Sequence, residues 1–226
     1  MGEMITFPSN GNSCSGYLND GGGAGVIVIS EWWGLVPHIA DVTDRFGDAG
    51  FTALAPDLYH GGKTTEPDAA TKQMMELDMT TAANDLSGAI DVLIEKCGNP
   101  RVGVVGYCVG GGLALMLASQ RPEAVKAVAP YYGLFPWPGV QPDWSAIDAK
   151  VVGEYAELDD YYTPQLAGEL QATLRDLGKD ATLHIHDGAH HAFFNDSRPE
   201  VYSAEHALEA WERTLTLFRE ELAANA

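Results

Sequence analysis

The sequence predicts an α/β fold with a mostly parallel central sheet and helices on both of its faces. Short β-branched runs alternate with helical patterns along the chain, as in strands linked by crossover helices. The continuous apolar run Gly25-Val-Ile-Val-Ile29 is typical of a strand that is buried on both faces. The length of 226 residues suits one sizeable core, and no internal repeat divides the chain. We therefore expect residues 1–226 to form a single domain.

The expected elements begin with a small antiparallel entry of two edge strands, which the turn signal between Pro8 and Asn12 joins. Apolar periodicity and stop signals such as Asn99-Pro100 define the elements that follow. The expected strands are 4–7, 15–18, 25–29, 51–55, 101–106, 124–129, 150–155 and 181–186. The expected helices are 37–49, a helical stretch over 67–97, 109–119, 164–177 and 199–222.

Composition and charge exclude several classes of partner. The formal net charge is −19, and the 13 Lys and Arg residues are scattered, so we expect no nucleic acid and no anionic membrane as a partner. No apolar run approaches the length of a membrane span, and the first residues lack the pattern of a signal peptide. The odd cysteine count favours reduced thiols. We therefore expect a soluble, cytoplasmic protein.

One motif indicates the chemistry. Gly106-Tyr-Cys-Val-Gly110 follows an expected strand and opens an expected helix, the place of the G-x-S-x-G nucleophile elbow of α/β-hydrolases, with cysteine instead of serine. Small flanking residues let strand and helix pass closely, and the positive end of the helix favours a thiolate and a developing oxyanion. Cys108 is therefore the candidate nucleophile. The alternative that the motif alone leaves open is an unreactive, buried cysteine.

A carboxylate and a histidine complete a candidate triad in the order nucleophile, acid, histidine. Asp159 and Asp160 follow the next-to-last expected strand, and His190 and His191 follow the last one. Because loops after parallel strands meet at one carboxyl edge of the sheet, these side chains are expected near Cys108. The histidine would take the thiol proton, and the acid would hold its tautomer. Nothing local separates the two members of either pair.

Five segments resemble a known family. They are Ser30-Glu-Trp-Trp-Gly34, Pro56-Asp-Leu-Tyr59, Gly106-Tyr-Cys-Val-Gly-Gly111, Asp160-Tyr-Tyr-Thr-Pro164 and His191-Ala-Phe-Phe-Asn195. With them the chain resembles the dienelactone hydrolases, also called carboxymethylenebutenolidases, over nearly its whole length. The resemblance implies an α/β-hydrolase fold and a triad of Cys108, Asp160 and His191. The spacing to Pro164 favours Asp160, and the following Ala-Phe-Phe favours His191.

The resemblance also implies roles for three further residues. In the family, a glutamate at the position of Glu31 contacts the resting cysteine and moves when substrate arrives, so that the thiolate forms only in the complex. By the same resemblance, the backbone N–H groups of Trp32 and Val109 form the oxyanion hole.

The expected substrate-binding positions depart from the family. Dienelactone hydrolases hold the substrate carboxylate with two arginines, whereas His60 and Asn195 stand at those positions here, with Lys63 and Arg198 nearby. We therefore expect cleavage of an ester or enol-lactone bond, with a general carboxylesterase of uncharged esters as the alternative. The residues expected to shape the substrate pocket are Tyr59, His60, Trp32, Trp33, Phe135, Trp137, Asn195 and Arg198.

Other functions stay open at this point. A member of the fold that only binds a small molecule is one, although a complete triad with Glu31 argues against it. A peroxide-reactive thiol at Cys108 is another, although no CxxC motif or resolving cysteine lies nearby. A third is a metal site of four histidines, His184, His186, His190 and His191. The hydrolytic chemistry itself requires no metal or organic cofactor, and water is its cosubstrate.

Overall fold

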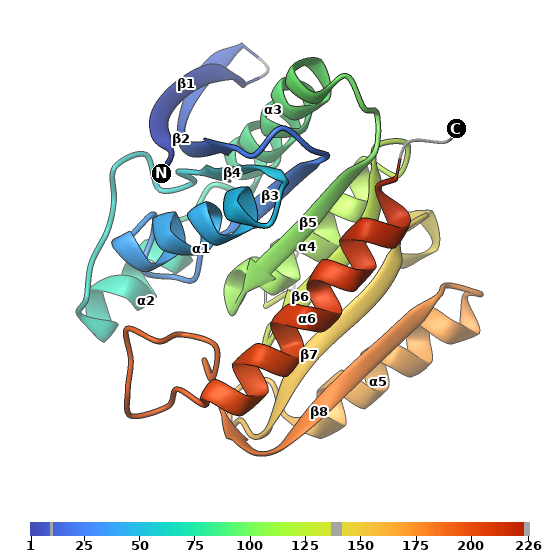
Figure 1. The fold of residues 1–226 in the computed structure, drawn as a ribbon. Helices are drawn as coiled ribbons and strands as arrows, with labels where there is room; N and C mark the ends of the chain where they lie inside the picture. Colours follow the sequence, from blue (N-terminus) through green and yellow to red (C-terminus); the bar gives the residue numbers. More distant parts are fainter. Residues whose placement is uncertain (10, 137–141, 224–226) are drawn as a thin grey trace.

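A computed structural model of the protein describes residues 1–9, 11–136 and 142–223. Its strands are β1 (Glu3–Ser9), β2 (Asn12–Asp20), β3 (Gly25–Ile29), β4 (Thr52–Pro56), β5 (Val102–Tyr107), β6 (Val125–Tyr131), β7 (Lys150–Leu158) and β8 (Ala181–His190). They form one sheet in the order β1-β2-β4-β3-β5-β6-β7-β8 (Figure 1). β2 pairs antiparallel with both β1 and β4, and all other neighbours are parallel.

Helices cover both faces of the sheet. They are α1 (Pro37–Asp48), α2 (Pro67–Met75), α3 (Met79–Cys97), α4 (Val109–Gln120), α5 (Pro164–Asp176) and α6 (Ala204–Glu221), with a short 3₁₀ helix at Trp144–Ala146. In Figure 1, α1 and α6 lie in front of the sheet, and α3, α4 and α5 lie behind it. Side chains that alternate along β3 therefore enter two cores: Ile27 and Ile29 pack on the α3 and α4 side, and Val26 and Val28 on the α1 and α6 side.

The α/β-hydrolase fold expected from the sequence is confirmed, and the structure refines several element boundaries. The helical stretch over 67–97 is two helices, because the Asp78 carboxylate accepts a 2.7 Å hydrogen bond from the Thr81 N–H and caps a new helix. The last helix begins at Ala204 rather than at 199, since the N–H of Ser203 bonds to the carbonyl oxygen of Phe193 and holds the preceding residues in a loop. β8 continues to His190 instead of ending at 186.

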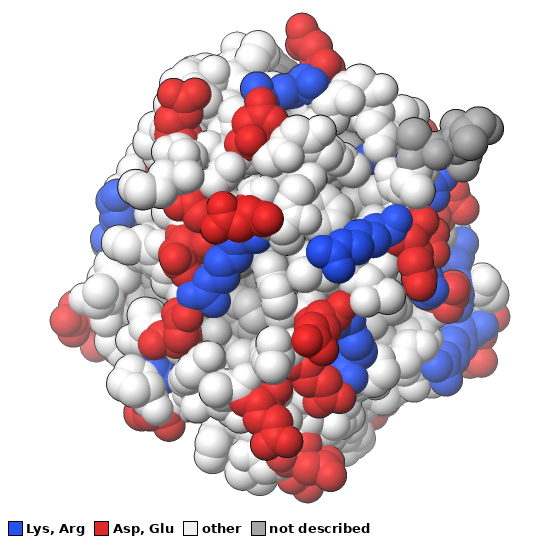
Figure 2. Space-filling view, in the orientation of Figure 1, with Lys and Arg blue, Asp and Glu red and all other residues white. Residues whose placement is uncertain are grey.

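The surface carries the excess of acidic residues that the composition requires. On the face shown in Figure 2, acidic side chains are spread widely, and Lys and Arg lie beside them rather than gathering into a basic patch. Many of these neighbours are ion pairs, such as Arg213 with Glu209 at 2.7 Å. Among the described residues, no helix has both the length and the apolarity to cross a membrane.

The strand ends decide where a site can form. Cys108 is the first residue after β5, Asp159 the first after β7, and His191 the first after β8. Because these strands are parallel, the three residues emerge at the same edge of the sheet. The loop at 191–203 leads from this edge to α6 and passes below α2 in the view of Figure 1.

Candidate active site

Cys108 occupies a sharp turn between β5 and α4. Its backbone has φ 55° and ψ −123°, a left-handed conformation that costs a non-glycine residue on the order of 1–3 kcal/mol. Hydrogen bonds hold it there: its N–H donates to the carbonyl oxygen of Tyr131 at 3.0 Å, and its carbonyl oxygen accepts from Gly111 N–H at 2.9 Å. The side chain is 9% exposed and stands at the N-terminus of α4. This is the geometry of a nucleophile elbow.

Two glycines make the turn sterically possible. A Cβ atom at Gly106 would stand 2.0 Å from the carbonyl oxygen of Gly110, and a Cβ at Gly110 would stand 2.6 Å from the carbonyl oxygens of Ile29 and Ser30. Backbone atoms cannot move away as a flexible side chain can. The second contact also brings the end of β3, and with it Glu31 and Trp32, against the start of α4.

We expect Gly106→Ala to lower the free energy of unfolding by about 3 kcal/mol or more, because its Cβ meets backbone at 2.0 Å. Gly168→Ala is the matched control: Gly168 lies in α5, a Cβ there meets nothing within 4 Å, and helix propensity predicts a gain of about 0.5–1 kcal/mol. Urea unfolding of both variants checks the prediction. If the Gly106→Ala protein is as stable as the wild type, the close contact between residue 106 and the Gly110 carbonyl oxygen is contradicted.

His191 pairs with Asp159, and the prediction of Asp160 as its partner is wrong. The distance from His191 Nδ1 to Asp159 Oδ2 is 2.7 Å. Asp159 Oδ1 accepts hydrogen bonds from the backbone N–H groups of Tyr161 at 2.8 Å and Tyr162 at 2.9 Å, so both carboxylate oxygens are engaged and the side chain is buried. Asp160, by contrast, is exposed.

The physical reason lies in the length of β7. The strand continues to Leu158, which pairs with His190 across a register shift, so the chain turns at Asp159 rather than one residue later. An aspartate that accepts from the N–H groups two and three residues ahead is typical of a turn that follows a strand. Counting from the true strand end, instead of back from Pro164, would have selected Asp159.

Electrostatics favour a protonated His191. Burial alone lowers the pKa of the imidazole, but hydrogen bonds to Asp159 and to the Cys108 sulfur, with the charges of both groups, raise it to about 10. Burial raises the pKa of Asp159, yet the hydrogen bonds from His191 and from the backbone N–H groups of Tyr162 and Tyr161 lower it below its usual value overall. The arrangement can therefore hold an imidazolium against the Asp159 carboxylate.

The raised pKa of His191 predicts a pH-dependent stability. A folded-state pKa of about 10 means that the folded protein binds this proton more tightly than the unfolded chain. The stabilisation is then complete below the ordinary value near 6.5 and is lost as the pH rises through about 10. We expect His191→Gln to lower the free energy of unfolding by on the order of 3 kcal/mol near pH 6, and by much less near pH 10.5.

Urea unfolding at both pH values measures this difference. His190→Gln removes the neighbouring exposed imidazole and serves as the control, because any pH dependence that both variants share does not come from the buried pair. If His191→Gln lowers the free energy of unfolding equally at both pH values, the pairing of His191 with Asp159 is contradicted.

Glu31 is buried beside the site and is bonded to Asn195. Its Oε2 atom accepts from Asn195 Nδ2 at 2.9 Å, and the Asn195 amide oxygen accepts from the N–H and the hydroxyl of Ser197. Both residues are 2% exposed. Among the described residues, no hydrogen bond joins Glu31 to Cys108, and Glu31 Oε1 has no partner. Asn195, expected in the substrate pocket, is thus positioned to hold Glu31, and both its amide nitrogen and its amide oxygen are engaged within the protein.

The two N–H groups expected to form the oxyanion hole lie on adjoining segments. The N–H of Val109 is the first of α4 and has no partner within the helix. Trp32 follows Glu31 in the segment that the end of β3 brings to α4, and its carbonyl oxygen accepts from Gln73 Nε2 at 3.1 Å. Its ring packs edge to face on Trp33, with centroids 5.1 Å apart.

Tyrosines surround the sulfur and the imidazole. The rings of Tyr132, Tyr161 and Tyr162 lie 5.1, 5.7 and 5.8 Å from that of His191. Burial and the nearby Cys108 raise the pKa of both Tyr59 and Tyr162, and the Tyr59 hydroxyl is buried without a partner among the described residues. Tyr59 is among the pocket residues expected from the sequence, whereas the other tyrosines are not. Tyr161 and Tyr162 could have been found from the sequence, because they directly follow the aspartate pair in Asp159-Asp-Tyr-Tyr162.

The remaining residues expected in the substrate pocket lie in different surroundings. Phe135 is half-buried and packs against the core on the α3 and α4 side, while Trp137 lies outside the described residues. His60 Nε2 lies 2.9 Å from Asp85 Oδ2, a buried carboxylate of α3, although that oxygen has no well-aligned hydrogen bond. Arg198 Nε donates to Glu200 at 2.9 Å. Each of these two side chains thus contacts a carboxylate other than the site's Asp159.

Two of the four histidines considered as metal ligands have other partners. His186 Nε2 lies 2.7 Å from Glu154 Oε2, and the same carboxylate accepts from Arg213 Nε at 2.9 Å, so this histidine belongs to a buried polar cluster under α6. His191 pairs with Asp159. Within the described part of the chain, no group of three or more His, Cys, Asp or Glu side chains is arranged to hold a metal.

The sequence matches the model of the Dienelactone hydrolase family over residues 16–222. The chain belongs to this family. A Carboxymethylenebutenolidase of Rhodococcus opacus is 27% identical to it over 89% of this chain and 83% of its own length. Membership shows a hydrolase of the ester or lactone type.

One further relative and one solved structure are similar to the chain over nearly its whole length. The chain is 35% identical to "Protein usf" of Aquifex pyrophilus over 98% of this chain and 100% of that protein. Its fold is also similar to that of a dienelactone hydrolase-like promiscuous phosphotriesterase from metagenomic libraries. That similarity has a TM-score of 0.85 at 21% identity, with 99% of both chains covered. At this identity the likeness shows the fold alone.

Proposed function

We propose that this family member hydrolyses an ester or lactone that is uncharged around its acyl group, with Cys108 as nucleophile, His191 as proton carrier and Asp159 as the acid that orients it. The observation that carries the proposal is the 2.7 Å pair of His191 and Asp159 at the edge where Cys108 stands in its strained turn. The three residue types suit these roles, because a thiolate attacks, an imidazole moves protons, and a carboxylate fixes the tautomer.

The reaction would run in two halves. The Cys108 sulfur attacks the carbonyl carbon, and the N–H groups of Val109 and Trp32 stabilise the oxyanion of the tetrahedral intermediate. The C–O bond then breaks, the leaving oxygen takes the proton from His191, and a thioester remains. In the second half His191 accepts a proton from water, whose oxygen attacks the thioester, and the acid is released as the sulfur leaves as thiolate. In a lactone the leaving oxygen stays attached to the acyl chain.

The partners of the side chains at the candidate carboxylate-binding positions support an uncharged substrate. His60 lies against Asp85, Arg198 against Glu200, and the amide of Asn195 against Glu31. The aromatic rings of Tyr132, Tyr161 and Tyr162 instead border His191. A substrate carboxylate bound here would lose its hydration without gaining a bidentate partner, which is costly. An aromatic or aliphatic ester or lactone would bury apolar surface against these rings.

A matched pair of substrates tests the proposal. We expect kcat/KM for the methyl ester of dienelactone, measured at the lactone bond, to exceed that for dienelactone itself by about tenfold or more, the effect of at least about 1.4 kcal/mol of carboxylate desolvation. His60→Arg places a guanidinium at one of the positions where the family has an arginine. We expect this variant to lower the ratio of the two kcat/KM values, because the guanidinium favours the charged substrate.

Three results would count against the proposal in different ways. Faster turnover of dienelactone than of its methyl ester would overturn the uncharged substrate class while leaving the nucleophile in place. Turnover of simple aryl esters but of neither lactone would favour a general carboxylesterase. Binding without any turnover that depends on Cys108 would favour a non-catalytic member of the fold.

A further inference from the structure

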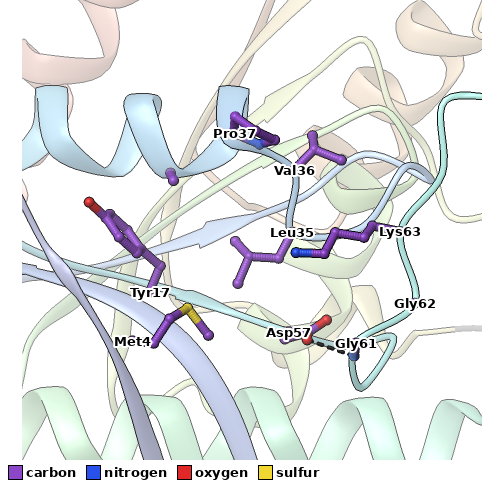
Figure 3. Close-up of a pocket in the computed structure, with 10 residues that line it drawn as sticks. Met4, Tyr17, Leu35, Val36, Pro37, Asp57, Gly61, Gly62 and Lys63 are labelled. Atoms are coloured by element: carbon purple, nitrogen blue, oxygen red, sulfur yellow. Dashed lines mark hydrogen bonds between the residues drawn. The ribbon is translucent and has the colours of Figure 1, made fainter.

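A cavity near the start of α1 is lined by residues other than Cys108, His191 and Asp159. Its volume is about 230 Å³, and its walls come from the loop between β3 and α1, from residues 57–63 after β4, and from β1 and β2 (Figure 3). None of the three proposed catalytic residues lines it. At roughly 30 Å³ for each water molecule, it has room for several waters or for one small organic molecule, and it is smaller than typical drug-sized sites.

One oxygen of a buried carboxylate in this cavity lacks a partner. Asp57 is 9% exposed, and its Oδ2 atom accepts from the N–H of Gly61 at 2.7 Å. Its Oδ1 atom is fully buried and has no hydrogen-bond partner among the described residues. Figure 3 shows the carboxylate beside Gly61, among the residues that line the cavity. Such an oxygen is costly to leave unpaired, so the cavity favours a ligand that donates a hydrogen bond.

A positively charged side chain also lines this cavity. The side chain of Lys63 is exposed and extends over Leu35, with its ammonium group directed into the cavity (Figure 3). No carboxylate of the described residues lies within ion-pair distance of it, whereas Lys72 on α2 has Glu76 at 3.8 Å. The ammonium is thus available to an anionic group on a ligand.

Apolar side chains form the rest of the wall. Met4 lies on one side, and Leu35, Val36 and Pro37 on the other, while the hydroxyl of Tyr17 is occupied by Asp44. A ligand that fits the cavity therefore needs three parts: a donor for Asp57, an anion for Lys63 and a short apolar body.

We propose that this cavity binds a small zwitterion of the amino-acid type, with its ammonium group on Asp57 Oδ1, its carboxylate on Lys63 and an aliphatic side chain against the apolar wall. The ligand would bridge the segments at 34–37 and 57–63. The residues next to these segments already meet, because the Thr64 N–H donates to the Trp33 carbonyl oxygen at 3.2 Å. The proposal does not depend on the substrate or the nucleophile proposed above.

Isothermal titration calorimetry with three related probes tests it. L-Leucine carries both charged groups, 3-methylbutylamine lacks the carboxylate, and 4-methylpentanoate lacks the amine. We expect L-leucine to bind to the wild-type protein and to the Cys108→Ala variant with equal affinity, and each analogue to bind at least about tenfold more weakly. Asp57→Asn and Lys63→Ala should each weaken the binding of L-leucine by at least about tenfold, and the control Lys72→Ala should leave it unchanged.

Ala40→Leu provides a variant that leaves both charged groups in place. Ala40 lines the cavity from α1, and leucine suits a helix while filling the space, so this variant should fold and lose the binding. No binding of L-leucine at millimolar concentration would show that only water satisfies Asp57 and would overturn the proposal. Equal binding of L-leucine and 3-methylbutylamine, or unchanged binding in Ala40→Leu, would overturn it as well.

Discussion

Replacement of Cys108 by alanine is expected to reduce kcat/KM for ester or lactone hydrolysis by about 10⁴-fold or more. Under the proposed mechanism, the variant loses the atom that attacks the carbonyl carbon, and the proposed oxyanion hole alone supplies only residual catalysis. Cys108→Ser is expected to keep a small fraction of the activity, because a hydroxyl beside His191 is a weaker nucleophile than a thiolate. Steady-state hydrolysis of an uncharged aryl ester measures both effects.

Cys97→Ala is the matched control for this experiment. Cys97 is a free thiol at the end of α3, half-buried and outside the site. Its replacement should leave kcat/KM within about twofold of the wild-type value, as for most changes away from a site. Urea unfolding of Cys108→Ala should show a folded protein. Wild-type activity in a folded Cys108→Ala protein would eliminate the thiol mechanism, and a loss in Cys97→Ala would show that thiol replacement acts through stability.

Asp159→Asn is expected to lower kcat by about 10²- to 10⁴-fold, whereas Asp160→Asn should stay within about twofold of the wild-type value. The amide keeps the size of the side chain but cannot stabilise the imidazolium, and it can leave His191 in the wrong tautomer. Asp160 is exposed and takes no part in the 2.7 Å contact. The two substitutions are adjacent and chemically identical. Any difference in kcat between the two variants therefore comes from the position of the carboxylate.

The pH dependence of kcat/KM distinguishes a role of Asp159 in orienting His191 from a general structural role. Asp159 contributes to the rise in the pKa of His191, so its loss should move the pKa observed in kcat/KM downward. Asp160→Asn should leave the profile unchanged. A stronger effect of Asp160→Asn, or an unshifted profile in Asp159→Asn, would contradict the observed pairing.

The fold and the nucleophile turn were predictable because local sequence carries them. The apolar run at 25–29 becomes a strand with those bounds, since it is buried on both faces of a parallel sheet. Gly106 and Gly110 are required by backbone contacts within a few residues, so the elbow could be recognised from its spacing. The α/β-hydrolase fold and the family followed from such local patterns.

Which aspartate pairs with His191 could be decided only from the tertiary structure. Whether the chain turns at Asp159 or at Asp160 depends on how far β7 pairs with β8, and that pairing is set by contacts between segments about 30 residues apart. No property of the dipeptide itself distinguishes its two carboxylates. The start of α6 is similar, because the bond from Ser203 to Phe193 replaces helical turns that the sequence pattern allows.

By itself, the sequence determined the class of fold, the turn that holds Cys108 and the approximate position of the histidine, because periodicity, glycine sterics and strand order act over short distances. Only the tertiary structure decided which side chains meet. Asn195 reaches Glu31 across 164 positions in sequence, and His60 reaches Asp85 on another element. Long-range packing therefore decides whether a polar side chain faces substrate or satisfies a buried charge.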